Sequence, residues 1–411
     1  GSLAAESWRY RGSHSVPNGR RLQASSDTLA RLYGDLPNDT EVAIYYALSL
    51  IVTAPKTDTT FARQKRAAAI LNPLFQRFPT HPGLAHYIIH ANDSPQLATL
   101  GLDAARRYAQ IAPSAPHAQH MPSHIFIRRG LWDETIAANQ RAFDAGVEYA
   151  IAHNTGVAPE QFHALDYMVY AYLQQGRDAL ARRTVDSAQH LKATLAYDAM
   201  VANYNRVAME ARVPLERGDW AAAARLPVRA GGMTIGAALG HFTRGIGAAH
   251  TGDTAAATEA LGALDEIEAD MVRRGDAEWS RVVGIKQHIV RSWLALAAGD
   301  TAAALRDAGA AADLEDVTEK HPVTPGELLP ARELQGDMLL ATGRYSAARA
   351  AYDATLSRES RRARAIYGAA RAAELAGDRT AARERYQEYL TQMQRADGDR
   401  AEIARVREAS R

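Results

Sequence analysis

The sequence contains no cysteine, and this absence excludes several kinds of chemistry at once. A chain without cysteine forms no disulfide bond, binds no metal through thiolate and has no cysteine nucleophile. The usual sequence indication of redox compartment is missing for the same reason. Any binding of a soft metal must therefore use histidine or methionine.

Long hydrophobic runs and an excess of charge of one sign are missing as well. The 411 residues include 48 basic and 47 acidic side chains, which are well mixed and leave a net charge of +1. No stretch approaches the roughly eighteen apolar residues of a membrane span, and no global field attracts nucleic acid. The sequence has no phosphate-cradling loop and no dinucleotide fingerprint, so it predicts no nucleotide cofactor.

Histidine, by contrast, is concentrated in one stretch. Two pairs, His86/His90 and His120/His124, are each spaced i, i+4 and are offset by 34 residues. That offset is the length of one tetratricopeptide (TPR) helix–turn–helix unit, so we expect the pairs to occupy equivalent positions in neighbouring repeats and to share a site. Six of the fourteen histidines lie between residues 81 and 124, namely His81, His86, His90, His117, His120 and His124.

The region around these pairs has the pattern of helical hairpins. Asn38 or Asp39 is placed to cap a helix, a second helix is expected over about 60–78, and Pro82 suits the first turn of a third. Residues 1–36 are weakly patterned, with a polar stretch at 12–21 that we interpret as a loop. Aligning the repeat that begins at Pro37 with the histidine repeat puts Ile44 and Leu48 at the positions of His86 and His90. Repeat packing therefore does not require histidine there.

A turn centred on glycine and followed by alanine recurs along the rest of the chain. Two of its spacings equal the TPR length, and no long stretch alternates with the period of a strand. The sequence predicts one all-α, TPR-like solenoid over residues 1–411, a right-handed superhelix of about eight or nine hairpins. Within it we expect His-rich repeats at 37–130 and further repeats at 131–411, the latter with a proline-rich loop at 319–330. The turn glycines are Gly130, Gly176, Gly218, Gly252, Gly299, Gly343 and Gly377.

Positions counted back from these glycines predict the inner lining of the solenoid, since the first helix of each TPR hairpin faces the concave surface. The residues six and ten positions before four of the glycines are polar or aromatic more often than not. They are His124 and His120, Tyr170 and Asp166, Trp293 and Ile289, and Asp337 and Glu333.

An i, i+4 pair of histidines lies on one helix face, which is the geometry by which HExxH helices hold zinc. We therefore predict a divalent transition metal bound by His86, His90, His120 and His124. Nitrogen ligands without sulfur suit Zn, Cu(II), Fe(II) or Ni better than Mg or Ca. Histidines that only hydrogen-bond one another in a polar groove are the alternative. Further candidate ligands or supporting carboxylates are Asp93, His117, His163 and Asp166.

Four longer strings resemble a largely uncharacterised family of bacterial TPR-repeat proteins. The resemblance covers about residue 39 to the C-terminus and implies a TPR solenoid, but it implies no particular activity. Members of such families often begin with an export signal, and this chain starts with Gly1-Ser2, which is typical of a removed tag, so we favour the periplasm over the cytoplasm. The strings are HYIIHANDSPQLA, APSAPHAQHMPSHIFIRRGLWDETIAAN, FHALDYMVYAYLQQGRDALA and DLEDVTEKHPVTPGELLPARELQGDMLLATGRY.

The last of these strings contains the proline-rich loop, which has two interpretations. It is either a connector after which Arg332 and Glu333 make structural ion pairs, or a cap whose His321 or Glu327 acts on a ligand in the concave groove, because loops on rigid scaffolds often carry function.

Three functions remain open from the sequence. The first is a metal-binding repeat protein whose groove also holds a small molecule or peptide. The second is a metal-dependent hydrolytic or oxidative enzyme with Asp166, Tyr170, His321 or Glu327 as acid–base candidates. The third is a metal-free scaffold for a protein partner. In each case the clustered imidazoles are expected to have pKa values below the free value of about 6.5.

Overall fold

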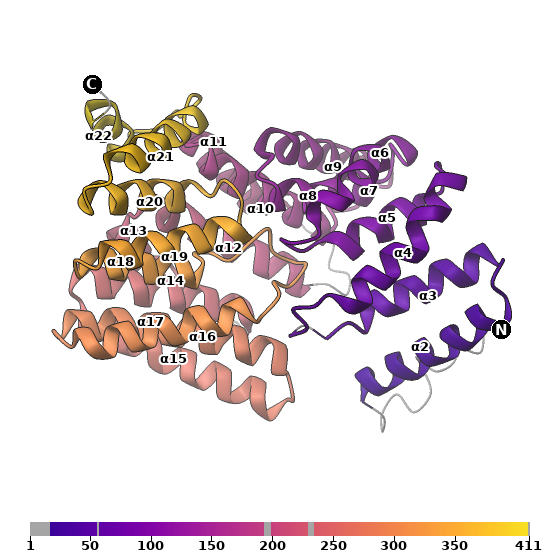
Figure 1. Ribbon diagram of the computed structural model, residues 1–411, viewed down its shortest axis with the longest axis horizontal. Helices are drawn as coiled ribbons and strands as arrows, with labels where there is room; N and C mark the ends of the chain where they lie inside the picture. The colour runs from indigo at the N-terminus through magenta and orange to yellow at the C-terminus, as the bar shows by residue number, and fades with distance from the viewer. Residues whose placement is uncertain (1–16, 56, 193–198, 229–233, 410–411) are drawn as a thin grey trace. The chain divides into compact units, whose positions relative to one another are not determined.

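The regular structure of the chain is helical throughout the residues that the computed structural model describes, which are 17–55, 57–192, 199–228 and 234–409. The chain divides into two compact units, residues 1–129 and 130–411, and in each unit consecutive helices pack in pairs (Figure 1). The expected fold class, an all-α, TPR-like helical-hairpin solenoid, is confirmed. No described helix combines the length and apolar character needed to cross a membrane.

The first unit is a series of short helical hairpins that ends with the His-rich stretch. Asp39 caps the second helix through a hydrogen bond from the Val42 amide, as its position predicted. The polar stretch expected to be a loop at 12–21 is helical from Asn18 on, and residues 12–16 lie outside the described residues. The elements are α2 Asn18–Asp35, α3 Thr40–Val52, α4 Ala62–Arg77, α5 Pro82–Asn92, the 3-10 helix η1 Ala98–Gly101, α6 Leu102–Ile111, α7 Pro116–His120 and α8 Pro122–Arg128.

The second unit continues the pattern with longer helices. Many of its helices are joined by short turns, and the longest connection runs from α17 to α18. The elements are α9 Trp132–Ala152, α10 Pro159–Gln174, α11 Asp178–His190, α12 Ala199–Arg217, α13 Trp220–Ala224, α14 Ile235–Thr251, α15 Thr254–Arg273, α16 Ala277–Ala297, α17 Thr301–Asp316, α18 Ala331–Ala341, α19 Tyr345–Arg358, α20 Ala363–Leu375, α21 Arg379–Gln392 and α22 Ala401–Ala409.

The seven turn glycines all adopt the left-handed conformation that ends a helix, with φ between 62° and 85°. This confirms the hairpin boundaries read from the sequence. Close helix approach also depends on glycine: at Gly247 in α14 a Cβ atom would lie 2.4 Å from the backbone nitrogen of Ala224 in α13. Alanine-rich faces pack in the same way around the largest core of the unit, which includes Phe242, Leu264 and Ile289.

Candidate metal centre

Helix α5 places two histidines on one face and its apolar residues on the other. Pro82 begins the helix, and the His81 side chain caps it by accepting a hydrogen bond from the Leu84 amide. Ile88 and Ile89 are almost completely buried, whereas His86 and His90 are only partly buried. One of the six clustered histidines, His81, therefore has a structural role in helix capping.

The imidazoles of His86, His90 and His117 converge on one point. The Nε2 atom of His86 lies 3.1 Å from Nε2 of His90 and 3.1 Å from Nε2 of His117. Ligand nitrogens of all three lie within 4.8 Å of one another, and His117 is exposed. His117 lies on the short helix α7, 31 residues after His86. It joins the sequence-predicted pair on α5 as the third histidine of the group.

Hydrogen bonds alone do not account for both contacts of His86. A neutral imidazole nitrogen either donates one proton or accepts through one in-plane lone pair. Nε2 of His86 can therefore form a regular hydrogen bond with His90 or with His117, but not with both at 3.1 Å. Three lone pairs directed at one cation would satisfy all three nitrogens at once.

The second predicted pair forms its own contact nearby. Helix α7 ends at His120 and α8 begins at Pro122, and Nε2 of His120 lies 3.0 Å from Nε2 of His124. Nδ1 of His124 lies 2.9 Å from Oδ2 of Asp93, whose Oδ1 accepts a 2.9 Å hydrogen bond from Nε of Arg128. Asp93 thereby fixes the His124 ring and leaves its Nε2 facing His120.

The two groups of histidines lie next to each other within the first unit. The ring centroids of His90 and His124 are 6.1 Å apart, and those of His117 and His120 are 6.4 Å apart. Burial, together with the neighbouring His90, His117 and His124, lowers the pKa of His86 to about 3. The expected fall in imidazole pKa is confirmed for His86, which is therefore neutral at pH 7.

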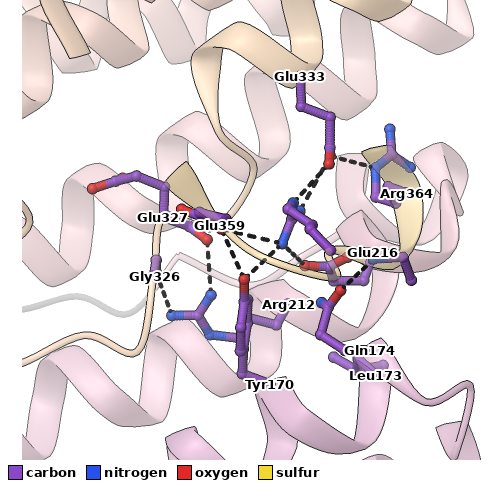
Figure 2. A network of polar contacts seen from close by, with 12 residues as sticks. Tyr170, Leu173, Gln174, Arg212, Glu216, Gly326, Glu327, Glu333, Glu359 and Arg364 are labelled. Carbon is purple, nitrogen blue, oxygen red and sulfur yellow. Dashed lines mark hydrogen bonds and ion pairs between the residues drawn. The ribbon is translucent and has the colours of Figure 1, made fainter. Parts of the chain in front are cut away.

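The remaining candidates lie in the second unit. His163 packs edge-on against Tyr167 on α10, with ring centroids 4.9 Å apart. Asp166 is completely buried and receives two hydrogen bonds from Arg212, at 2.8 and 3.4 Å. Burial raises the pKa of Asp166, although Arg212 opposes this. Tyr170 donates to Glu359 at 2.9 Å. Figure 2 shows Tyr170 and Arg212 inside this network of polar contacts.

The connection between α17 and α18, residues 317–330, includes the proline-rich loop predicted at 319–330. It contributes backbone oxygens to the same network. Arg212 donates to the carbonyl oxygens of Gly326 and Glu327 at 2.9 and 3.0 Å (Figure 2). Burial opposes ionisation of Glu327, but Lys286 at 3.0 Å, together with Arg212 and Lys320, outweighs it, so the pKa of Glu327 is lowered. His321 lies against Trp279, with ring centroids 4.8 Å apart.

The residues that follow the loop make the ion pairs of the connector interpretation. Arg332 pairs with Asp313 and Asp316, at 2.7 and 2.5 Å. Glu333 pairs with Arg362 and Arg364, at 2.6 and 2.9 Å. These contacts tie helix α18 to α17 and α20, and Val323, Thr324, Leu328 and Leu329 of the loop are buried.

Sequence reasoning missed two arginines that organise this network. Arg212 lies six positions before Gly218, which is the same offset that predicted Tyr170 and Asp337. The same rule would therefore have placed Arg212 on the inner lining. Arg362 directly precedes α20 and has no such register. It pairs with Glu216 and Glu333, at 2.8 and 2.6 Å, and all three are buried.

No family model matches the sequence, and no curated protein matches it. Solved structures that are similar in architecture include yeast Tom70, with 9% identity over 99% of this chain and 96% of that chain and a TM-score of 0.33. The human IFIT1 dimer with m7Gppp-AAAA has 11% identity over 96% of this chain and 81% of that chain, with a TM-score of 0.35. The P58(IPK) TPR domain has 12% identity over 90% of this chain and 96% of that chain, with a TM-score of 0.26. The resemblance to a bacterial TPR-repeat family stays a prediction.

Proposed function

We propose that this chain is a helical-repeat protein that binds one divalent transition metal ion through Nε2 of His86, His90 and His117. The observation that carries the proposal is the pair of 3.1 Å contacts at His86 Nε2, which one imidazole nitrogen cannot make as two regular hydrogen bonds. A metal–nitrogen distance of about 2.0–2.1 Å separates two ligand nitrogens by about 2.9 Å at a right angle and about 3.4 Å at the tetrahedral angle. The 3.1 Å spacing of His86 Nε2 from each of the other two ligands lies between these values.

The type of ligand atom favours some ions over others. Three neutral imidazoles suit Zn, Cu(II), Ni or Fe(II), whereas Mg and Ca prefer oxygen ligands. Three protein ligands leave at least one coordination position for a further group. His120 and His124 lie beside the three ligands, so they are placed to supply another nitrogen or to hydrogen-bond whatever occupies that position.

Binding rather than catalysis is the function that the contacts favour. The acid–base candidates Asp166 and Glu327 are engaged with Arg212 and Lys286 in the second unit. Asp93, the carboxylate that contacts the histidine cluster, is engaged with His124 and Arg128. We therefore propose that the bound ion presents an open coordination position to a small molecule or to a side chain of a peptide partner.

Calorimetric titration of chelator-treated protein tests the proposal. Zn(II), Cu(II) and Ni(II) are expected to bind at one ion per chain, and Mg(II) and Ca(II) are not. A His86→Leu, His90→Leu variant should lose this binding while remaining folded, because aliphatic residues occupy the equivalent positions one repeat earlier. His153→Leu, His190→Leu is the matched control, since both of its histidines are exposed in the second unit. Unchanged stoichiometry in the first variant would contradict the site.

A further inference from the structure

The second unit contains a cavity that lies outside the histidine cluster. It has a volume of about 250 Å³ and lies where the turn between α12 and α13 meets α14, α18, α20 and α21. Its walls include Leu340, Tyr367 and Tyr389. Ligand sites are commonly concave, largely apolar and equipped with a few convergent polar groups. The polar groups of this cavity decide what it can bind.

Two hydrogen-bond donors lie close to one place in the cavity. Nη1 of Arg364 and Nε1 of Trp220 each lie 3.9 Å from the position that a Cβ atom of Gly218 would occupy. Because Gly218 has no side chain, the space in front of it is open to a ligand oxygen within reach of both nitrogens. Among the described residues, neither nitrogen has a hydrogen-bond acceptor, although both could donate.

The surrounding contacts hold these donors in place. Nε of Arg364 donates to Glu333 at 2.9 Å and Nη2 donates to Asp337 at 2.7 Å, which leaves Nη1 as the free end of a fixed guanidinium group. The Arg364 side chain keeps 18% of its surface exposed. The Trp220 indole stacks on His250 with ring centroids 3.8 Å apart and an interplanar angle of 2°.

The charges and walls of the cavity limit the class of ligand. The charged residues that line it cancel, so a polyanion such as inorganic phosphate gains no net attraction. One guanidinium nitrogen and one indole N–H match the two oxygens of a carboxylate, and the aromatic walls match an apolar body. The charged lining residues are Arg217, Arg364 and Arg400 against Glu216, Asp337 and Glu402.

We propose that this cavity binds a monocarboxylate joined to an apolar group, with the carboxylate held by Arg364 Nη1 and Trp220 Nε1. The apolar group contacts Leu340, Tyr367 and Tyr389. Such a carboxylate is found on a small organic acid and at the C-terminus of a peptide that ends in an apolar residue. This site is separate from the proposed metal centre, and its test does not depend on metal binding.

Titration followed by saturation-transfer NMR measures the binding, with phenylacetate as the probe and phenylacetamide as its neutral counterpart. We expect phenylacetate to bind at least about tenfold more tightly, because hydrogen bonds to a charged group are the stronger ones. Inorganic phosphate should not displace it. A pentaglycyl-phenylalanine peptide and its C-terminal amide distinguish the sources: tighter binding of the free-acid peptide than of phenylacetate identifies a chain terminus, and weaker binding identifies a free acid.

Two variants locate the binding. Trp220→Phe keeps the ring that stacks on His250 but removes the donor, and it should weaken phenylacetate binding about tenfold, whereas Trp132→Phe outside the cavity should not. Gly218→Ala should block the ligand oxygen, while Gly343→Ala, whose φ is also positive and whose Cβ would meet nothing within 4 Å, should leave binding intact. Equal binding of acid and amide, unchanged binding in both cavity variants, or no saturation at about 20 mM phenylacetate would overturn the proposal.

Discussion

At the scale of single residues, the surroundings of His86 decide its protonation. Its pKa is lowered to about 3 by burial and by three neighbouring imidazoles, whereas the unfolded chain has a value near 6.5. The folded state therefore binds fewer protons than the unfolded state. The contribution of His86 to stability is fully present above pH 6.5 and is lost as the pH falls towards 3.

Replacing His86 with leucine should remove this dependence on pH. With chelator present, the wild-type protein should lose about 2 kcal/mol of unfolding free energy through His86 between pH 7.5 and pH 5. His86→Leu should lose less by about that amount, as measured by urea denaturation at both values. The exposed His190 serves as control, since His190→Leu should leave the dependence unchanged. Parallel losses in wild type and His86→Leu would show that His86 is not protonated on unfolding.

The sequence identified a cluster of histidines, but it did not identify which of them contact one another. The 34-residue offset identified both histidine pairs, but Nε2 of His86 meets His117 and His90, while His120 and His124 meet each other. The direction of each ring depends on how α7 passes into α8 around Met121, which a spacing rule does not contain. The register of the turn glycines similarly selected Asp166 but not its partner Arg212.

At the scale of elements, one buried arginine makes three hydrogen bonds to the loop at 317–330. Arg212 on α12 donates to Asp166 on α10 and to Thr324, Gly326 and Glu327 of the loop. Both Arg212 and Asp166 are completely inaccessible to solvent. A loop anchored from the interior in this way is part of the core of the second unit.

Arg212→Met should therefore destabilise the protein strongly. Removing one partner of a buried ion pair leaves an uncompensated charge, and the expected loss is about 3–5 kcal/mol of unfolding free energy. The additional Asp166→Leu change should restore part of this loss, but not the hydrogen bonds to Gly326 and Glu327. Urea denaturation of the two variants and the wild type at pH 7 measures both effects. A loss below about 1 kcal/mol in Arg212→Met would show that the pair is not a net contributor.

The helix ends could be predicted from the sequence because their local patterns repeat. The anchoring of the loop could not be predicted in this way. The cap at Asp39, the proline at the start of α5 and the left-handed glycines each follow from one residue type in a short context. The contacts of Arg212 with the loop join residues more than 100 positions apart. No periodic pattern marks such pairs.

At the scale of the whole molecule, the two compact units carry different kinds of polar cluster. All five histidines of the candidate metal centre belong to residues 1–129, and the buried ionic network belongs to residues 130–411. A ligand that binds only the folded form of one unit stabilises that unit by mass action. The effect of metal on local opening should therefore be uneven along the chain.

Hydrogen exchange followed by mass spectrometry measures this unevenness. Addition of Zn(II) to chelator-treated protein should slow amide exchange in α5, α7 and α8, because the ligands lie on or beside these helices. Exchange in α14–α17 should not change. Equal protection of both regions would mean that the ion binds elsewhere or acts through the whole chain.

The most direct test of the metal centre is a crystal structure of the Zn-loaded protein with anomalous difference density recorded at the zinc edge. We expect one strong peak about 2.0–2.1 Å from each Nε2 of His86, His90 and His117. Density only at other positions, or no peak in a crystal grown with excess zinc, would contradict it.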